Sequence, residues 1–70
     1  MKKFLVVIEK TLNNYSAYSP DLPGCVATGE TIEETEKNMY EAIDLHIQGM
    51  IEDNMTIPES TSIAEYVVVR

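Results

Sequence analysis

One segment of this sequence, residues 31–54, is long enough and periodic enough to form a helix that covers a sheet. At 100° per residue its apolar side chains fall on one face and its charged side chains on the other. The apolar face consists of Ile32, Thr35, Met39, Ala42, Ile43, His46, Ile47 and Met50. We therefore predict one amphipathic helix, against which the other segments must pack.

The ends of this helix are marked by residues with specific roles. Thr31 can cap the free backbone N–H groups of the first turn, and Glu34, three residues later, completes a capping box. Asn54 can adopt the left-handed conformation that closes a helix, and Pro58 prevents its continuation. The predicted helix thus starts at residue 31 and ends near residue 54.

Four segments have the composition of β-strands: residues 2–10, 15–18, 25–29 and 63–70. The first and the last are apolar on both sides, which is typical of strands in the middle of a sheet. A meander of the first three strands, followed by the helix, makes the fourth strand parallel to the first. The sequence therefore predicts one α+β domain over residues 1–70, with the order βββαβ and a four-stranded sheet of spatial order 3-2-1-4.

A rigid loop joins the second and third predicted strands. Two prolines and a glycine fall within the six residues Ser19-Pro20-Asp21-Leu22-Pro23-Gly24, and proline fixes φ. An apolar side chain held between two prolines, Leu22, either folds back to fill the domain or is presented to a partner. The sequence leaves both alternatives open.

Charge, length and cysteine content restrict the function. The formal net charge is −7, with 12 acidic against five basic residues, so nucleic acid would be repelled, whereas a small basic protein would be attracted. The same charge also fits a role in solubility alone.

A chain of 70 residues has a small core, and a single cysteine forms no internal disulfide, so we expect a homo-oligomer. Because no signal peptide or membrane span is recognisable, we expect a cytoplasmic protein.

No catalytic, cofactor or metal site emerges from the side chains. The carboxylates of the helix lie on its solvated face and do not form a pair that would hold divalent ions. His46 lies on the apolar face without a second histidine or a nucleophile, and Cys25 has no basic neighbour in sequence. We expect both to be packed structurally, and Tyr40 to lie at the rim of the buried helix face. We predict that the protein is not an enzyme.

The central part of the chain resembles a known family. The run Tyr15-Ser16-Ala17-Tyr18-Ser19-Pro20-Asp21-Leu22-Pro23-Gly24-Cys25-Val26-Ala27-Thr28-Gly29-Glu30-Thr31, then Glu34 and Asn38-Met39-Tyr40-Glu41-Ala42-Ile43, is similar to the HicB antitoxin domain of prokaryotic HicAB toxin–antitoxin systems. The resemblance implies a partial ribonuclease H-like fold and a partner, HicA, which is a small basic toxin that cleaves RNA. Relatives often carry a C-terminal DNA-binding segment, and because this chain ends at Arg70, we expect no direct DNA binding.

Combining the loop with the resemblance yields a hypothesis for the toxin-binding residues. We expect the contact on one loop and one helical residue: Tyr18, Asp21, Leu22, Pro23, Gly24, Cys25 and Tyr40. The alternatives are a stand-alone oligomeric scaffold of the same fold without an active toxin, and a small hydrolase of the ribonuclease H type.

Overall fold

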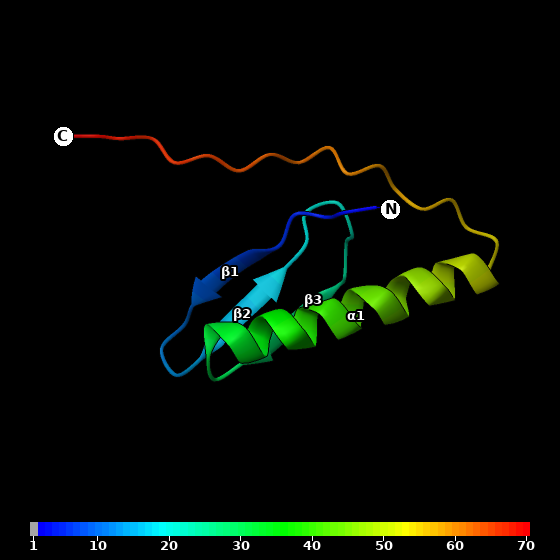
Figure 1. Cartoon of the computed structure of the whole chain (residues 1–70), viewed down its shortest axis with the longest axis horizontal. Helices are drawn as coiled ribbons and strands as arrows, with labels where there is room; N and C mark the ends of the chain where they lie inside the picture. The colour runs from blue at the N-terminus through cyan, green and yellow to red at the C-terminus, as the bar shows by residue number, and fades with distance from the viewer. Residues whose placement is uncertain (1) are drawn as a thin grey trace.

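Three short strands and one long helix make up the regular structure in a computed structural model, which describes residues 2–70. The strands are β1 (Val7–Lys10), β2 (Tyr15–Tyr18) and β3 (Val26–Gly29), and the helix is α1 (Ile32–Glu52). The strands form one antiparallel sheet of order β1-β2-β3, with α1 across one face (Figure 1). The α+β class and the order of these four elements agree with the sequence prediction.

The register of the sheet separates a covered face from an open one. Ile8, Ala17 and Ala27 are paired across the three strands, and this row packs in the core, where Ala17 is buried. The neighbouring row consists of Val7, Tyr18 and Val26. Because successive side chains of a strand point to opposite faces, this second row lies on the face that α1 does not cover.

The start of α1 has the predicted cap. Thr31 is extended, with φ −129° and ψ 164°, and its Oγ1 accepts a hydrogen bond of 3.0 Å from the backbone N–H of Glu34. The Glu34 carboxylate accepts in turn from the backbone N–H of Glu30, at 3.2 Å. These bonds satisfy N–H groups that a helix start leaves free. At the other end Asn54 takes a positive φ of 56°, as predicted for the end of the helix.

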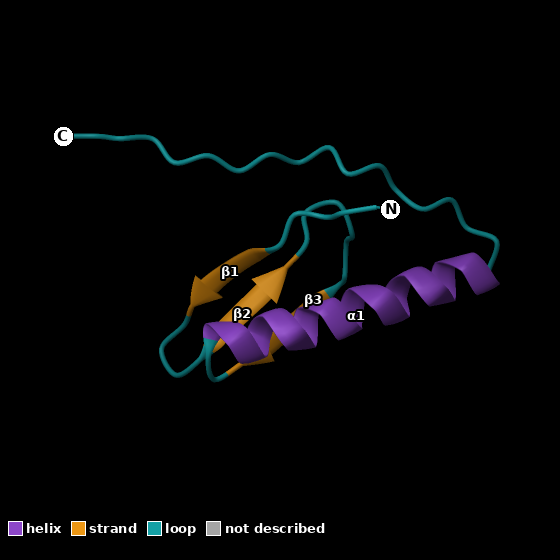
Figure 2. Ribbon diagram, viewed as in Figure 1, coloured by secondary structure: helices purple, strands orange, loops and turns teal. Residues whose placement is uncertain are grey.

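The predicted fourth strand is wrong for this structure. Residues 63–70 form no ladder with another described segment, and they run as an extended chain beyond the sheet (Figure 2). The sheet therefore has three strands, and the spatial order 3-2-1-4 is not observed. The first strand is also shorter than predicted, since residues 2–6 are outside the ladder. The amino-acid composition of a segment indicates a preference for extended backbone, but it does not identify the neighbouring strand with which the segment must pair.

Candidate functional site

The loop between β2 and β3 is held by short-range hydrogen bonds. The N–H of Leu22 donates to the carbonyl of Ser19, and the N–H of Cys25 donates to the carbonyl of Leu22, both at 3.1 Å. Gly24 has a φ of +84°, which a residue with a Cβ rarely adopts. The Ser19 hydroxyl donates to the carbonyl of Leu5 at 2.8 Å. The loop is thus two consecutive turns fastened to the chain just before β1.

Leu22 could either pack inside the domain or be presented to a partner, and the structure shows the first, because its side chain lies in the core. Leu22 is 1% exposed and packs in the core with Ala17, Cys25 and Met39. Cys25 is buried as well, and burial raises the pKa of its thiol, so the thiol stays protonated at neutral pH. These two residues form the base of the loop and support its exposed residues from below.

Asp21 binds the segment that follows the helix. Its carboxylate accepts hydrogen bonds from the backbone N–H and the hydroxyl of Ser62, at 3.1 and 2.8 Å. It also accepts from the backbone N–H and the hydroxyl of Thr61, at 3.2 and 3.3 Å. The bonds from the Ser62 backbone and hydroxyl contribute most to holding the pKa of Asp21 below its usual range. Asp21 is therefore a latch that fixes residues 61–62 to the loop.

The remaining predicted residues lie on two different surfaces. Pro23 and Gly24 are exposed on the loop, and Tyr18 is 41% exposed on the open face of the sheet. Tyr40 is 72% exposed on α1, which covers the opposite face. The structure therefore brings Tyr18 and the loop together and places Tyr40 apart from them, at the rim of the helix face as the periodicity predicted.

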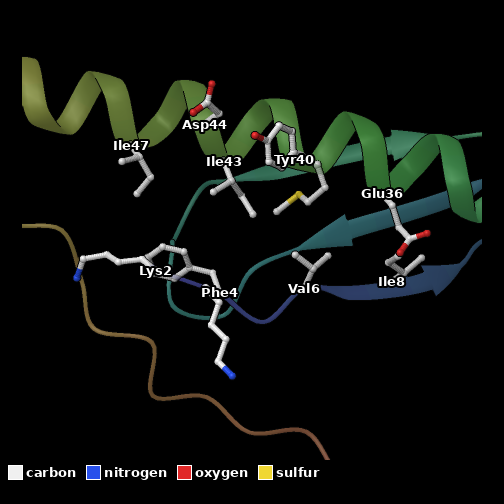
Figure 3. A pocket seen from close by; sticks show the side chains of 11 residues that line it. Lys2, Phe4, Val6, Ile8, Glu36, Tyr40, Ile43, Asp44 and Ile47 are labelled. Carbon is white, nitrogen blue, oxygen red and sulfur yellow. The ribbon is translucent and has the colours of Figure 1, made fainter.

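A groove that the sequence analysis missed lies between α1 and the chain leading into β1. It has a volume of about 520 Å³ and an apolar floor to which Phe4, Val6, Ile8, Met39, Ile43 and Ile47 contribute. Figure 3 shows Lys2 and Phe4 at one end of the groove and Ile8 and Glu36 at the other, with Tyr40 and Asp44 along the helix side. The groove exists because α1 packs mainly over β3 and β2, which leaves the β1 side of the helix uncovered.

Two further classes of site are absent from the part of the chain that the structure describes. Between residues 2 and 70, no three His, Cys, Asp or Glu side chains gather closely enough to hold a metal ion. Over the same residues, no helix is both long and apolar enough to cross a membrane.

Sequence comparison connects the chain with a group of small bacterial and phage proteins. The family model described as the HicB-like antitoxin of bacterial toxin–antitoxin systems matches residues 4–69. An uncharacterised 14.9 kDa protein of Haemophilus phage HP1 is 42% identical over 62 residues, which are 89% of this chain and 47% of that protein. A UPF0150 protein of Synechocystis is 36% identical over 63 residues, covering 89% of this chain and 80% of the relative. The chain thus spans about half the length of the phage relative.

Structural comparison leads to the same family. A chain of the HicA3 and HicB3 toxin–antitoxin complex superposes with a TM-score of 0.63 and 30% sequence identity, over 77% of this chain and 66% of the other. Most of this chain therefore shares its fold with a chain of that toxin–antitoxin complex. This chain belongs to the HicB-like antitoxin family of bacterial toxin–antitoxin systems.

Proposed function

We propose that this protein binds and neutralises a small basic ribonuclease toxin of the HicA type in the bacterial cytoplasm. The observation that carries the proposal is the family match over residues 4–69. The likeness to a chain of a HicA3–HicB3 complex adds support, since that chain is part of a toxin–antitoxin assembly. In this proposal the protein acts by covering a surface of the toxin, and it needs neither a cofactor nor a metal.

The electrostatics of α1 suit a basic partner. Acidic side chains are exposed along the helix, whereas Lys37 is its only lysine or arginine; the exposed acids are Glu33, Glu34, Glu36, Glu41, Asp44 and Glu52. A surface of one sign attracts a partner of the opposite sign and accelerates their encounter. The acidic side of α1 is therefore the part of the molecule that would orient a basic toxin.

The loop would supply a preorganised contact on a second surface. In the proposed complex Tyr18, Pro23 and Gly24 contact the toxin directly, and Tyr40 adds a second contact from the helix. Asp21, Leu22 and Cys25 contribute by holding the shape of the loop, because their side chains face the latch and the core. A loop fixed by prolines and short hydrogen bonds loses little conformational entropy on binding.

Calorimetry with the purified HicA-like toxin tests this surface. Tyr18→Ala and Tyr40→Ala should each raise the dissociation constant by about tenfold or more, since buried tyrosines are frequent hot spots of interfaces. Leu12→Ala is the matched control, because Leu12 is 95% exposed in the turn between β1 and β2. If neither tyrosine changes the affinity while the toxin still binds, the contact lies on another surface.

A second candidate function is a stand-alone oligomeric scaffold. The open row of Val7, Tyr18 and Val26 favours it, because an apolar strip on a sheet face is suited to covering by another protein. This function predicts that no HicA-like protein binds in the same calorimetry, although the folded chain still associates with itself.

A further inference from the structure

The C-terminal segment, residues 56–70, is attached to the domain mainly at one point. Most of its residues are exposed, and the half-buried ones are Ile57, Pro58 and Ser62. Within the part of the chain that the structure describes, the hydrogen bonds of this segment all end at the carboxylate of Asp21. Because so little of the segment is buried, its position beside the domain (Figure 1) depends mainly on the latch.

The same latch anchors the outer side of the loop between β2 and β3. The buried residues of the inner side are Ser19, Leu22 and Cys25. Asp21 lies on the outer side, at the third position of the first of the two turns, and Pro23 and Gly24 follow it as exposed residues. The hydrogen bonds within the turns join loop residues to one another, whereas the latch ties the outer side to a distant part of the chain.

The latch opens and closes as one unit. Oδ2 of Asp21 accepts the backbone N–H groups of Thr61 and Ser62, and Oδ1 accepts the two hydroxyls of the same residues. A carboxylate has about four acceptor positions, so all of them are occupied in the closed latch. The four donors belong to two adjacent residues and therefore leave together. Because Asp21 is only half-buried, water replaces the lost donors, and opening costs far less free energy than unfolding the domain.

We propose that Thr61 and Ser62 are positioning residues for the binding of the toxin, because they hold the outer side of the loop in the shape that the toxin contacts. This inference rests on the proposed function. With the latch closed, the loop and the C-terminal segment are both fixed, and with the latch open, both are released. Coupling between two sites is reciprocal, so a toxin that binds the fixed loop also holds the C-terminal segment in place without touching it.

Hydrogen exchange tests the connection in the free protein. Thr61→Val combined with Ser62→Ala removes both hydroxyl donors at positions 40 and 41 residues away from Asp21. The amides of Leu22 and Cys25, which close the two turns, should then exchange at least about threefold faster. Ser60→Ala removes a hydroxyl that is not part of the latch and should leave these rates unchanged. If the two loop amides do not respond to the double variant, the latch holds only the segment, and the proposal is wrong.

Calorimetry with a purified HicA-like toxin tests the effect on binding. The same double variant should raise the dissociation constant by about fivefold or more, while its circular dichroism spectrum stays that of the unmodified chain. Thr61→Ser combined with Ser62→Thr keeps both hydroxyl donors and should bind like the unmodified chain. An unchanged affinity in the double variant overturns the positioning role and leaves the proposed function standing. An unmodified chain that binds no such toxin overturns the proposed function itself.

The direction of the coupling is tested by hydrogen exchange in the complex. In the unmodified chain, bound toxin should slow the exchange of the Thr61 and Ser62 amides, because a fixed loop keeps the latch closed. Faster exchange on binding would mean that the toxin takes the carboxylate of Asp21 away from these two residues, and it would contradict the proposal.

Discussion

At the scale of single residues, Gly29 is fixed by the closeness of the helix start. A Cβ built on Gly29 would lie 2.7 Å from the backbone nitrogen of Thr35 and 3.0 Å from its Cα. Backbone atoms in a capped first turn cannot move away without breaking hydrogen bonds, so added volume causes strain. We expect Gly29→Ala to lower the free energy of unfolding by about 1–3 kcal/mol, measured by urea denaturation.

Gly49 is the matched control for this substitution. It lies inside α1, and a Cβ there would meet nothing within 4 Å. Alanine has a higher helix propensity than glycine, so Gly49→Ala should raise the free energy of unfolding by about 0.5–1 kcal/mol. The two substitutions should thus have opposite signs, and equal destabilisation by both would contradict the contact at Thr35.

The Asp21 latch should respond to acid. Because four hydrogen bonds favour the charged carboxylate, the pKa of Asp21 is lower in the folded chain than in the unfolded one. The stabilisation is fully present above the unfolded value of about 4 and is lost as the pH falls through the lowered folded pKa. NMR spectra recorded against pH should show the amide signals of Thr61 and Ser62 moving together in that acidic range. In Asp21→Asn this shared titration should be absent, and its persistence would assign it to another carboxylate.

At the scale of elements, the start of α1 depends on one side chain. Thr31→Ala removes the hydroxyl oxygen that accepts the hydrogen bond from the backbone N–H of Glu34. The helix then loses its N-terminal side-chain cap. We expect the free energy of unfolding to fall by about 1 kcal/mol, measured by thermal denaturation followed by circular dichroism. Thr31→Ser keeps a hydroxyl acceptor and should retain most of the stability. If serine and alanine behave alike, the hydroxyl is not the stabilising group.

The elements that could be predicted from the sequence are those determined by local interactions. The helix followed from its periodicity, and its first turn from Thr31 and Glu34, because capping needs only neighbouring residues. The hairpin and the loop followed from turn residues in the same way. The fourth strand was wrong because pairing depends on a distant neighbour, and the composition of residues 63–70 contains no information about which neighbour that is.

The candidate site was predictable to a smaller extent. The loop stood out through its two prolines, but the direction of Leu22 depends on the space left beneath it by Ala17 and Met39. The latch joins Asp21 to residues 61–62, about 40 positions later, and no local pattern indicates such a contact. The groove was missed although Val6 and Ile8 alternate on one strand face, because its opening results from the position of α1 over the sheet.

At the scale of the whole molecule, charge is distributed unevenly. The net charge of −7 is accompanied by a helix whose exposed side is largely acidic, while Lys2 and Lys3 lie at the N-terminus beside the groove. Such a distribution orients a basic partner toward the acidic side of α1 before contact.

The acidic side of α1 leads to a prediction about rates. In stopped-flow experiments with a HicA-like toxin, raising the salt from about 0.05 to 0.5 M should slow association by about tenfold or more, since salt screens steering between exposed charges. The rate of dissociation should change less with salt.

Glu41→Gln combined with Asp44→Asn removes two charges from α1 and should reproduce part of the slowing of association at low salt. Glu59→Gln combined with Glu65→Gln removes two charges from the C-terminal segment and should leave the association rate nearly unchanged. Equal slowing by both pairs would mean that the net charge, and not the acidic side of α1, attracts the toxin.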